Sequence, residues 1–269
     1  MTAMKSANRK AVQDNNFGKV RSKKKVLNTV NESPQEQSVL GNKKRFTEHD
    51  MCTLKPMNTR QEEFLRLFYE GSEVMVASGA AGTGKSFLAM YCAISEVVRN
   101  DSPVDKIILV RSPVQTRDVG FLSGNEDKFS FYEAPYGSIC SDILFRYKDA
   151  YNHLKSLGTL EFHLTSFIRG TTFDNAIIIF DEFQSANYHE IASVITRAGH
   201  NSRVILCGDS KQDDLAGKGR KNDQSGFAKA MTVINKMPAN MVGCVEYKIE
   251  DIVRSGLVKE FLLADYYTS

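Results

Sequence analysis

The stretch Gly79-Ala80-Ala81-Gly82-Thr83-Gly84-Lys85-Ser86 decides the fold that this sequence predicts. It satisfies the phosphate-loop pattern G-x-x-x-x-G-K-[ST] at every fixed position. The glycines let backbone amides converge on phosphate oxygens, and the helix expected after them adds its positive N-terminal end. In such a loop Lys85 reaches the β- and γ-phosphates and Ser86 holds Mg²⁺. We therefore expect ATP and Mg²⁺ as ligands, with the nucleotide bound by Gly79, Ala80, Ala81, Gly82, Thr83, Gly84, Lys85, Ser86 and Phe87.

The residues around this loop have the pattern of an α/β protein. An apolar run at residues 74–78 predicts a buried strand before the loop, and residues 85–99 predict a helix after it. Further continuous apolar runs lie at residues 106–110, 176–180 and 203–207. Such runs, alternating with helical stretches, are typical of a parallel sheet that is covered on both faces. We predict an α/β fold of the RecA-like, P-loop NTPase kind with a single core.

Other segments are predicted less directly. Residues 61–69 have apolar residues at helical spacing, and Asn58 or Thr59 is placed to cap that helix. Residues 118–140, rich in glycine and aromatic residues, are expected to form a loop, and helical patterning resumes near residues 141–156.

Two carboxylates follow the apolar run that ends at Phe180. A strand carries Asp181 to the carboxyl edge of the sheet, where ligands bind in open α/β proteins. We expect Asp181 to contact Mg²⁺ through water, and Glu182 to polarise the attacking water. Glu182 favours a hydrolase over a small-molecule kinase, which needs a pocket for its acceptor instead.

The segment Gly208-Asp209-Ser210-Lys211-Gln212 follows another predicted strand. The Gln212 amide both donates and accepts hydrogen bonds, so it is suited to sense the γ-phosphate or the attacking water. The alternative is an ordinary turn built on Gly208 and Asp209.

Charge is distributed unevenly along the 269 residues. The chain has 35 basic and 32 acidic residues, a net charge of +3. Residues 1–45 hold eleven Lys and Arg against three acids, which gives 11 − 3 = +8, so the remainder carries 3 − 8 = −5. We interpret residues 1–50 as a flexible basic arm, either a solvated tail or a phosphate-binding arm for nucleic acid, and residues 51–269 as the ATPase domain.

Composition also excludes several classes of protein. No apolar run approaches the roughly 18 to 20 residues that a membrane span needs, and the N-terminus lacks a secretory apolar stretch. The five cysteines are scattered and form no Cys-x-x-Cys pair, which argues against a disulfide framework or a zinc ribbon. We expect a cytoplasmic protein without a membrane partner.

In these motifs and their order, the chain resembles the PhoH-like proteins, phosphate-loop ATPases related to the first half of superfamily 1 helicases. The resemblance covers roughly residues 55–268. Besides the segments quoted above, it rests on Arg111-Ser112-Pro113, Gly120-Phe121-Leu122-Ser123-Gly124, Ala134-Pro135-Tyr136, Arg169-Gly170-Thr171-Thr172-Phe173, Phe180-Asp181-Glu182-Phe183-Gln184, Thr196-Arg197-Ala198-Gly199, Ser225-Gly226-Phe227 and Asp251-Ile252-Val253-Arg254. The chain departs from the family pattern at Phe183 and Ser185, and at Ser210-Lys211, where a proline is common; neither change removes a group that hydrolysis needs.

The resemblance implies roles for further residues. By similarity to superfamily 1 enzymes, Asn58 and Gln61 lie near the adenine; the alternative is a helix cap and a surface glutamine. Those helicases close the ATP site with arginines from a second core, and this chain has one core. We therefore expect a homo-oligomer, a head-to-tail ring of six subunits, in which Arg197 or Arg254 reaches the neighbouring site. The alternative for each arginine is a surface ion pair.

The resulting prediction is a Mg²⁺-dependent ATPase coupled to nucleic acid, helicase-like and acting on single-stranded RNA or DNA. Its nucleic-acid contacts are expected from Arg111, Gln115, Thr116, Arg117 and the aromatic stretch Phe129-Ser130-Phe131-Tyr132. The aromatic residues have the alternative of packing their own loop. The alternative function is an ATP-controlled oligomeric scaffold that unwinds nothing.

Overall fold

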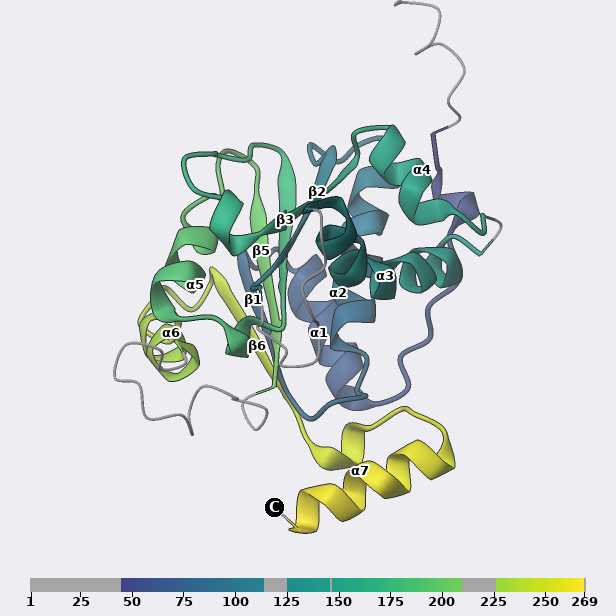
Figure 1. The fold of residues 1–269 in the computed structure, drawn as a ribbon, viewed down its shortest axis with the longest axis vertical. Coiled ribbons are helices and arrows are strands. Elements are labelled where there is room, and N and C mark those ends of the chain that lie inside the picture. The colour runs from purple at the N-terminus through teal and green to yellow at the C-terminus, as the bar shows by residue number, and fades with distance from the viewer. Residues whose placement is uncertain (1–44, 114–124, 146, 210–225, 269) are drawn as a thin grey trace, which may run out of the picture. The chain divides into compact units, whose positions relative to one another are not determined.

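A computed structural model describes residues 45–113, 125–145, 147–209 and 226–268 of the chain (Figure 1). The strands are β1 (Val74–Gly79), β2 (Lys106–Arg111), β3 (Leu160–Leu164), β4 (Ala176–Asp181), β5 (Arg203–Gly208) and β6 (Val242–Tyr247). The helices are α1 (Thr59–Tyr69), α2 (Lys85–Val98), α3 (Asn125–Ile143), α4 (Ala150–Ser156), α5 (Tyr188–Ile195), α6 (Phe227–Ile234) and α7 (Gly256–Thr268), with 3-10 turns η1 (Glu48–Asp50), η2 (Thr165–Phe167), η3 (Phe183–Ser185) and η5 (Ile249–Asp251). None of the helices in these ranges combines the length and apolar character that crossing a membrane requires.

The strands form one parallel sheet in the order β3-β2-β4-β5-β1-β6. This confirms the predicted α/β fold. β5 lies between β1 and β4: Leu206 is opposite Val76 of β1 on one side and Phe180 of β4 on the other. Since all strands run in one direction, the carboxyl ends of β1, β4 and β5 meet at a single edge, which is where the phosphate loop and Asp181 lie.

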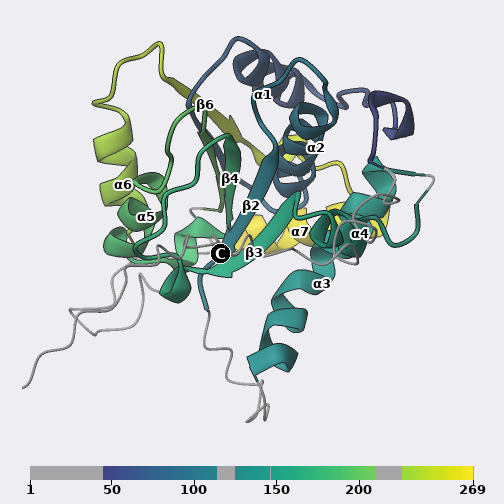
Figure 2. The same ribbon diagram turned by 90° about the horizontal axis from the view of Figure 1, so that it is seen from above.

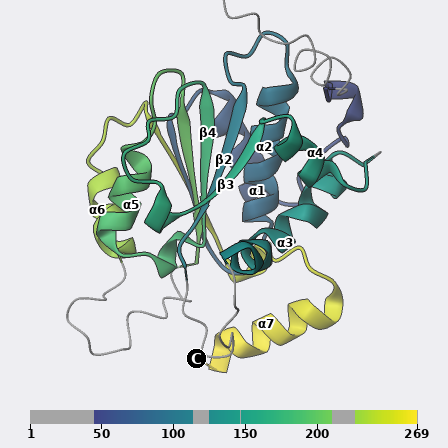
Figure 3. The same ribbon diagram turned by 45° about the horizontal axis from the view of Figure 1, so that its top comes forward.

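Helices cover both faces of the sheet (Figures 2 and 3), as the all-apolar strands predict. Alternate residues of one strand belong to two cores: Ile177 and Ile179 pack on the side of α1 to α4, whereas Ile178 and Phe180 pack on the side of α5 and α6. All four side chains are at most 1% exposed. The central strands are therefore sequestered on both faces, which makes the sheet edge the accessible part of β4.

The strands β3 and β6, which lie at the two edges of the sheet, were not predicted from the sequence. β3 and β6 carry polar residues between their apolar ones: Glu161 and His163 are partly buried, and Glu246 is exposed. Continuous apolar runs, the signal that predicted the other strands, are a property of central parallel strands.

Helix α3 corrects the predicted loop at residues 118–140 over residues 125–140, the part that the structure describes. The helix runs through Asn125–Ile143 although it contains Pro135 and Gly137, residues that usually interrupt helices. Its buried residues Tyr136, Cys140 and Ile143 follow at i, i+4 and i+7 and join the core beside α2. Tertiary packing of this stripe outweighs the local signals that favoured a loop. The helical patterning expected near residues 141–156 is confirmed in part: α4 (Ala150–Ser156) forms its second half, whereas α3 already ends at Ile143 and the two helices are separate.

Several predicted features lie outside the described residues: most of the basic arm (1–44), Gln115, Thr116 and Arg117, and the segment containing Gln212. The packed chain nevertheless includes part of the predicted arm. Phe46 is 7% exposed, and its ring lies 4.7 Å from that of Tyr147 and 5.0 Å from that of His153.

Candidate nucleotide site

The phosphate loop connects the end of β1 to the start of α2. Gly84 has a φ of +90° and occupies the N-cap position of α2, where it provides no capping side chain. A Cβ at Gly84 would lie 3.1 Å from Nε2 of Gln61, so glycine is favoured by both backbone conformation and space. Because Gly84 has no side chain, no capping group accepts hydrogen bonds from the first backbone amides of α2. These amides therefore remain available to an anion, as in other anion-binding helix N-termini.

Lys85 folds back over the loop. Its Nζ donates hydrogen bonds to the carbonyl oxygens of Gly79 and Ala80, each at 2.8 Å. Burial lowers the pKa of the Lys85 ammonium, while the nearby carboxylates, Asp209 foremost, act in the opposite direction. The Lys85 ammonium group thus lies within the phosphate loop, where it is placed to contact the phosphates of a nucleotide.

The loop and β4 meet at a hydroxyl and a carboxylate. Ser86 Oγ donates to Asp181 Oδ1 at 2.8 Å, joining residues that are 95 positions apart in the sequence. Asp181 is 6% exposed at the end of β4. A serine hydroxyl and a carboxylate oxygen are hard oxygen ligands of the kind that Mg²⁺ takes together with waters and nucleotide phosphates. The residues present therefore fit the predicted metal.

The second oxygen of the same carboxylate is also held. The hydroxyl of Tyr136, from the middle of α3, donates to Asp181 Oδ2 at 2.7 Å. Tyr136 is 1% exposed. Sequence reasoning quoted Tyr136 in a family motif but assigned it no role.

Glu182 lies beside this pair and is held by a residue that the sequence analysis overlooked. Nε2 of Gln184 donates to Glu182 Oε2 at 2.6 Å, and Oε1 of Gln184 accepts from the backbone amide of Asp209 at 3.1 Å. Gln184 is 2% exposed. It therefore connects the predicted water-activating carboxylate to the start of the segment that contains Gln212, which itself lies outside the described residues.

A cavity of about 810 Å³ opens at this edge of the sheet. Its lining includes the phosphate loop from Ala81 to Leu88 except Thr83, and also Asp181, Glu182, Gly208, Asp209, Arg111, Tyr136, Gln61, Val253 and Arg254. The phosphate loop, the pair Asp181 and Glu182, and the pair Gly208 and Asp209, which were all predicted to follow strands, thus line one cavity.

The residues predicted near the adenine have structural contacts of their own. Asn58 Oδ1 accepts from the amide of Gln61 at 2.9 Å, which confirms the helix-cap interpretation, and its Nδ2 donates to the carbonyl of Asp251. Gln61 is 4% exposed, so the surface interpretation is wrong. Its Nε2 donates to the Thr83 carbonyl at 3.0 Å and its Oε1 accepts from Met57. Both amides brace the phosphate loop and the segment near Asp251, at the rim of the cavity.

The two candidate arginines lie in different places. Arg254 lines the cavity, and its Cγ lies 2.9 Å from where a Cβ on Gly82 would be, beside the loop of its own chain. Arg197 lies at the opposite edge of the sheet: its carbonyl accepts from the amide of Phe173, just before β4 begins, and its Nη1 donates to the Thr171 carbonyl.

The aromatic stretch predicted to contact nucleic acid belongs to α3 rather than to a loop. Phe131 is 56% exposed, and the ring of Tyr132 lies 5.9 Å from Cζ of Arg111 at the end of β2. Arg111 itself lines the cavity.

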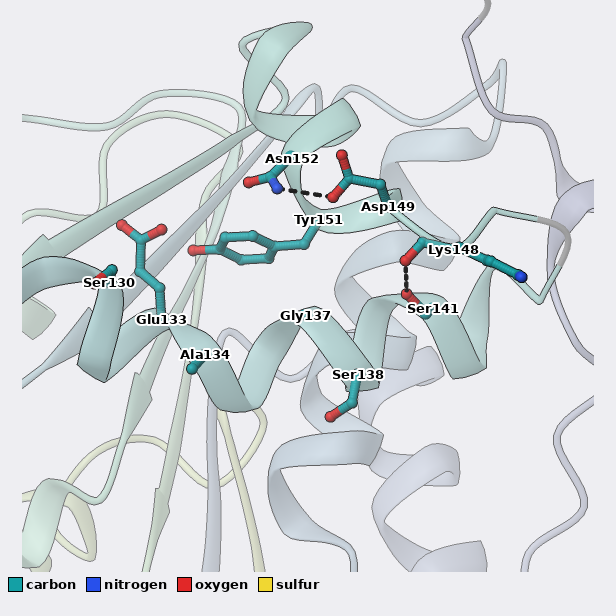
Figure 4. Close-up of a pocket in the computed structure, with 10 residues that line it drawn as sticks. All are labelled: Ser130, Glu133, Ala134, Gly137, Ser138, Ser141, Lys148, Asp149, Tyr151 and Asn152. Carbon is teal, nitrogen blue, oxygen red and sulfur yellow. Dashed lines mark hydrogen bonds between the residues drawn. The ribbon is translucent and has the colours of Figure 1, made fainter. Parts of the chain in front are cut away.

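A second hollow lies between α3 and α4, apart from the phosphate loop (Figure 4). Tyr151 of α4 points across it toward Glu133 of α3, and Lys155 Nζ bonds to Glu133 Oε2 at 2.7 Å. These contacts tie the two helices together.

The fold and the site define a P-loop nucleoside-triphosphate-binding protein: a parallel sheet with the phosphate loop after β1 and a metal-type carboxylate after β4. Comparison with known proteins narrows this class. The family model described as PhoH-like protein matches residues 53–266, and the chain belongs to that family.

Individual relatives agree with this assignment. Protein PhoH of Escherichia coli is 33% identical over 221 residues, which are 80% of this chain and 59% of that protein. PhoH-like proteins of Mycobacterium leprae (29% over 239 residues, 88% and 64%) and Bacillus subtilis (30% over 195 residues, 72% and 58%) are also similar. The chain thus spans about three fifths of the length of these relatives.

Proposed function

We propose that this chain is a Mg²⁺-dependent ATP hydrolase that couples turnover to the binding or remodelling of nucleic acid, with single-stranded RNA as the first candidate and single-stranded DNA as the second. The hydrolase proposal rests above all on the hydrogen bond between Ser86 and Asp181. That contact puts the loop hydroxyl and the strand-end carboxylate where one metal ion can be shared between them.

Each residue of the site has a task in this reaction. The loop amides and Lys85 bind the β- and γ-phosphates, with Lys85 exchanging the Gly79 and Ala80 carbonyls for phosphate oxygens. Ser86 and Asp181 would hold Mg²⁺, which when bound would neutralise charge on the phosphates. Glu182 orients a water and accepts its proton as the water oxygen bonds to the γ-phosphorus and the bond to the β-phosphate oxygen breaks.

Gln184 supports Glu182 in this role. Its amide holds the Glu182 carboxylate and also the backbone of Asp209, at the start of the segment that carries Gln212. A change at Asp209 on loss of the γ-phosphate would therefore alter the position of the Glu182 carboxylate through Gln184. A motor needs such a coupling between the state of the nucleotide and the position of its residues.

The nucleic-acid part of the proposal is supported by charge and by exposed aromatic surface. Residues 1–45 carry a charge of 11 − 3 = +8, which suits a phosphate-binding arm. Phe131 is more than half exposed and lies one residue from Tyr132, whose ring is near Arg111. Aromatic and cationic side chains together are suited to single strands. The five cysteines are free thiols, which suits a reducing compartment such as the cytoplasm.

We further propose that the protein acts as a head-to-tail ring, with six subunits as the first expectation. One core leaves the phosphates open on one side, and a neighbouring arginine would complete the site. In a head-to-tail ring each subunit presents different surfaces to its two neighbours. Arg197, at the sheet edge away from its own phosphate loop, suits the role in trans better than Arg254, which lies beside its own loop.

The rival function is an ATP-controlled scaffold. Helix α7 favours it, because Leu257 and Phe261 are 85% and 69% exposed and offer an apolar surface to a protein partner. A comparison of ATPase rates with single-stranded RNA, single-stranded DNA and duplexes separates the two. Stimulation by a single strand supports the motor, and a rate unchanged by every polymer supports the scaffold.

A further inference from the structure

Asp181 receives hydrogen bonds on both of its oxygens from two different elements. Ser86 at the start of α2 donates to Oδ1, and Tyr136 of α3 donates to Oδ2. A carboxylate held at both oxygens has a defined orientation, so one oxygen faces the phosphate loop and the other faces α3.

The contact between the Tyr136 hydroxyl and Asp181 is short and buried, because Tyr136 is 1% exposed and Asp181 is 6% exposed. An O–H group that donates to a carboxylate at 2.7 Å is a charge-assisted hydrogen bond, among the stronger kinds in proteins.

Helix α3 is anchored on two sides, so Tyr136 has little freedom to move. Cys140 and Ile143 pack into the core on the same face as Tyr136, and the ring of Phe162 in β3 lies 6.5 Å from the Tyr136 ring. On the side of α4, Lys155 Nζ pairs with Glu133 Oε2 at 2.7 Å.

We propose that Tyr136 is the positioning residue of the metal carboxylate: it holds Asp181 Oδ2 so that Oδ1 is presented to Ser86 and Mg²⁺. The inference rests on the proposed function, since it assumes that Mg²⁺–nucleotide binds here. A lone pair of Ser86 Oγ would be free to take Mg²⁺ while its proton still donates to Asp181 Oδ1, so both hydrogen bonds to Asp181 are compatible with a bound metal. The affinity of the site for Mg²⁺ therefore depends on α3.

Helix α3 also carries Tyr132, one turn before Tyr136, near Arg111. The strand ends of β2 and β4 lie side by side, with Arg111 opposite Asp181.

The test compares Tyr136→Phe with Tyr247→Phe in the full chain. Tyr247 is a matched control, because it is 2% exposed and, among the described residues, its hydroxyl has no hydrogen-bond partner. Binding of a fluorescent, non-hydrolysable ATP analogue is titrated with MgCl₂ and, in parallel, measured in EDTA; Mn²⁺ retained by the protein–nucleotide complex is measured by electron paramagnetic resonance. Circular dichroism melts check folding.

We expect Tyr136→Phe to raise the Mg²⁺ and Mn²⁺ concentrations at half-saturation about tenfold, the effect typical of losing a hydrogen bond to a metal ligand. Binding in EDTA should be unchanged, and Tyr247→Phe should match wild type in both arms.

Two results would overturn the inference alone: an unchanged metal requirement in Tyr136→Phe, or an equal loss of binding with and without metal, which would assign the hydroxyl a purely structural role. A wild-type chain that binds no nucleotide would overturn the proposed function together with the inference.

Discussion

Glu182 has a backbone conformation that few residues other than glycine adopt. Its φ and ψ are 55° and 41°, in the left-handed region. Such a conformation costs on the order of 1–3 kcal/mol and persists where surrounding contacts determine it, typically at functional sites. Here the contact is the hydrogen bond from Gln184, itself buried, which aims the carboxylate into the cavity.

Glu182→Gln is the substitution that isolates this carboxylate. It keeps the shape of the side chain and removes its ability to accept a proton, so ATP binding should persist while hydrolysis falls by about 10²–10⁴. Phosphate release at saturating ATP and equilibrium binding of a labelled nucleotide measure the two effects. Turnover close to that of wild type would show that another group activates the water.

At the residue scale, local motifs predicted the groups that we propose to react, but not the groups that hold them. Lys85, Ser86 and Asp181 are recognisable because their spacing and flanking strands follow from phosphate chemistry. Tyr136 and Gln184 have their roles through contacts across 45 and 25 residues of sequence. Only the packing of α3 and the order of β4 and β5 bring those contacts about, and neither is a local pattern.

Strand β4 is the element on which the site depends, because it is central and carries Asp181 at its end. Ile178 is fully buried and lies opposite Ile108 of β2 and Val204 of β5. Ile178→Ala should lower the free energy of unfolding by about 2–5 kcal/mol, through lost burial and the cavity that remains.

Urea denaturation measures this loss, with Cys244→Ala as the control. Cys244 is exposed on the edge strand β6, so its truncation should change the free energy of unfolding by no more than about 0.5 kcal/mol. Equal effects of the two substitutions would contradict the assignment of β4 to the centre of the core.

At the element scale, the sequence predicted the strands that have a neighbouring strand on both sides and missed the two strands at the edges of the sheet. The central strands β1, β2, β4 and β5 have continuous apolar runs, and α1 has its cap at Asn58 as expected. The edge strands β3 and β6 mix polar and apolar residues. Pro135 and Gly137 in α3 are typical of a loop, and contacts with distant parts of the chain, above all its stripe of buried residues, stabilise the helix.

For the whole molecule, a ring predicts that active sites are shared between subunits. Mixing Arg197→Ala subunits, which have an intact phosphate loop, with Lys85→Ala subunits, which have an intact arginine, should restore ATPase activity at mixed interfaces. A neighbouring arginine contributes about 10³–10⁵ in rate where it acts in trans. If the ATPase rate of the mixture equals the sum of the rates of the two separate variants at every mixing ratio, Arg197 is not the shared residue.

Hydrolysis of ATP by the purified chain tests the central claim most directly, measured with Mg²⁺ and with EDTA. The control for Lys85→Ala is Lys106→Ala, since Lys106 is 45% exposed and pairs with Glu161 at 3.7 Å, away from the phosphate loop. We predict Mg²⁺-dependent phosphate release by wild type and Lys106→Ala, and none above background by Lys85→Ala. Equal release by all three proteins, or release that survives EDTA, would contradict the assignment of this site to ATP hydrolysis.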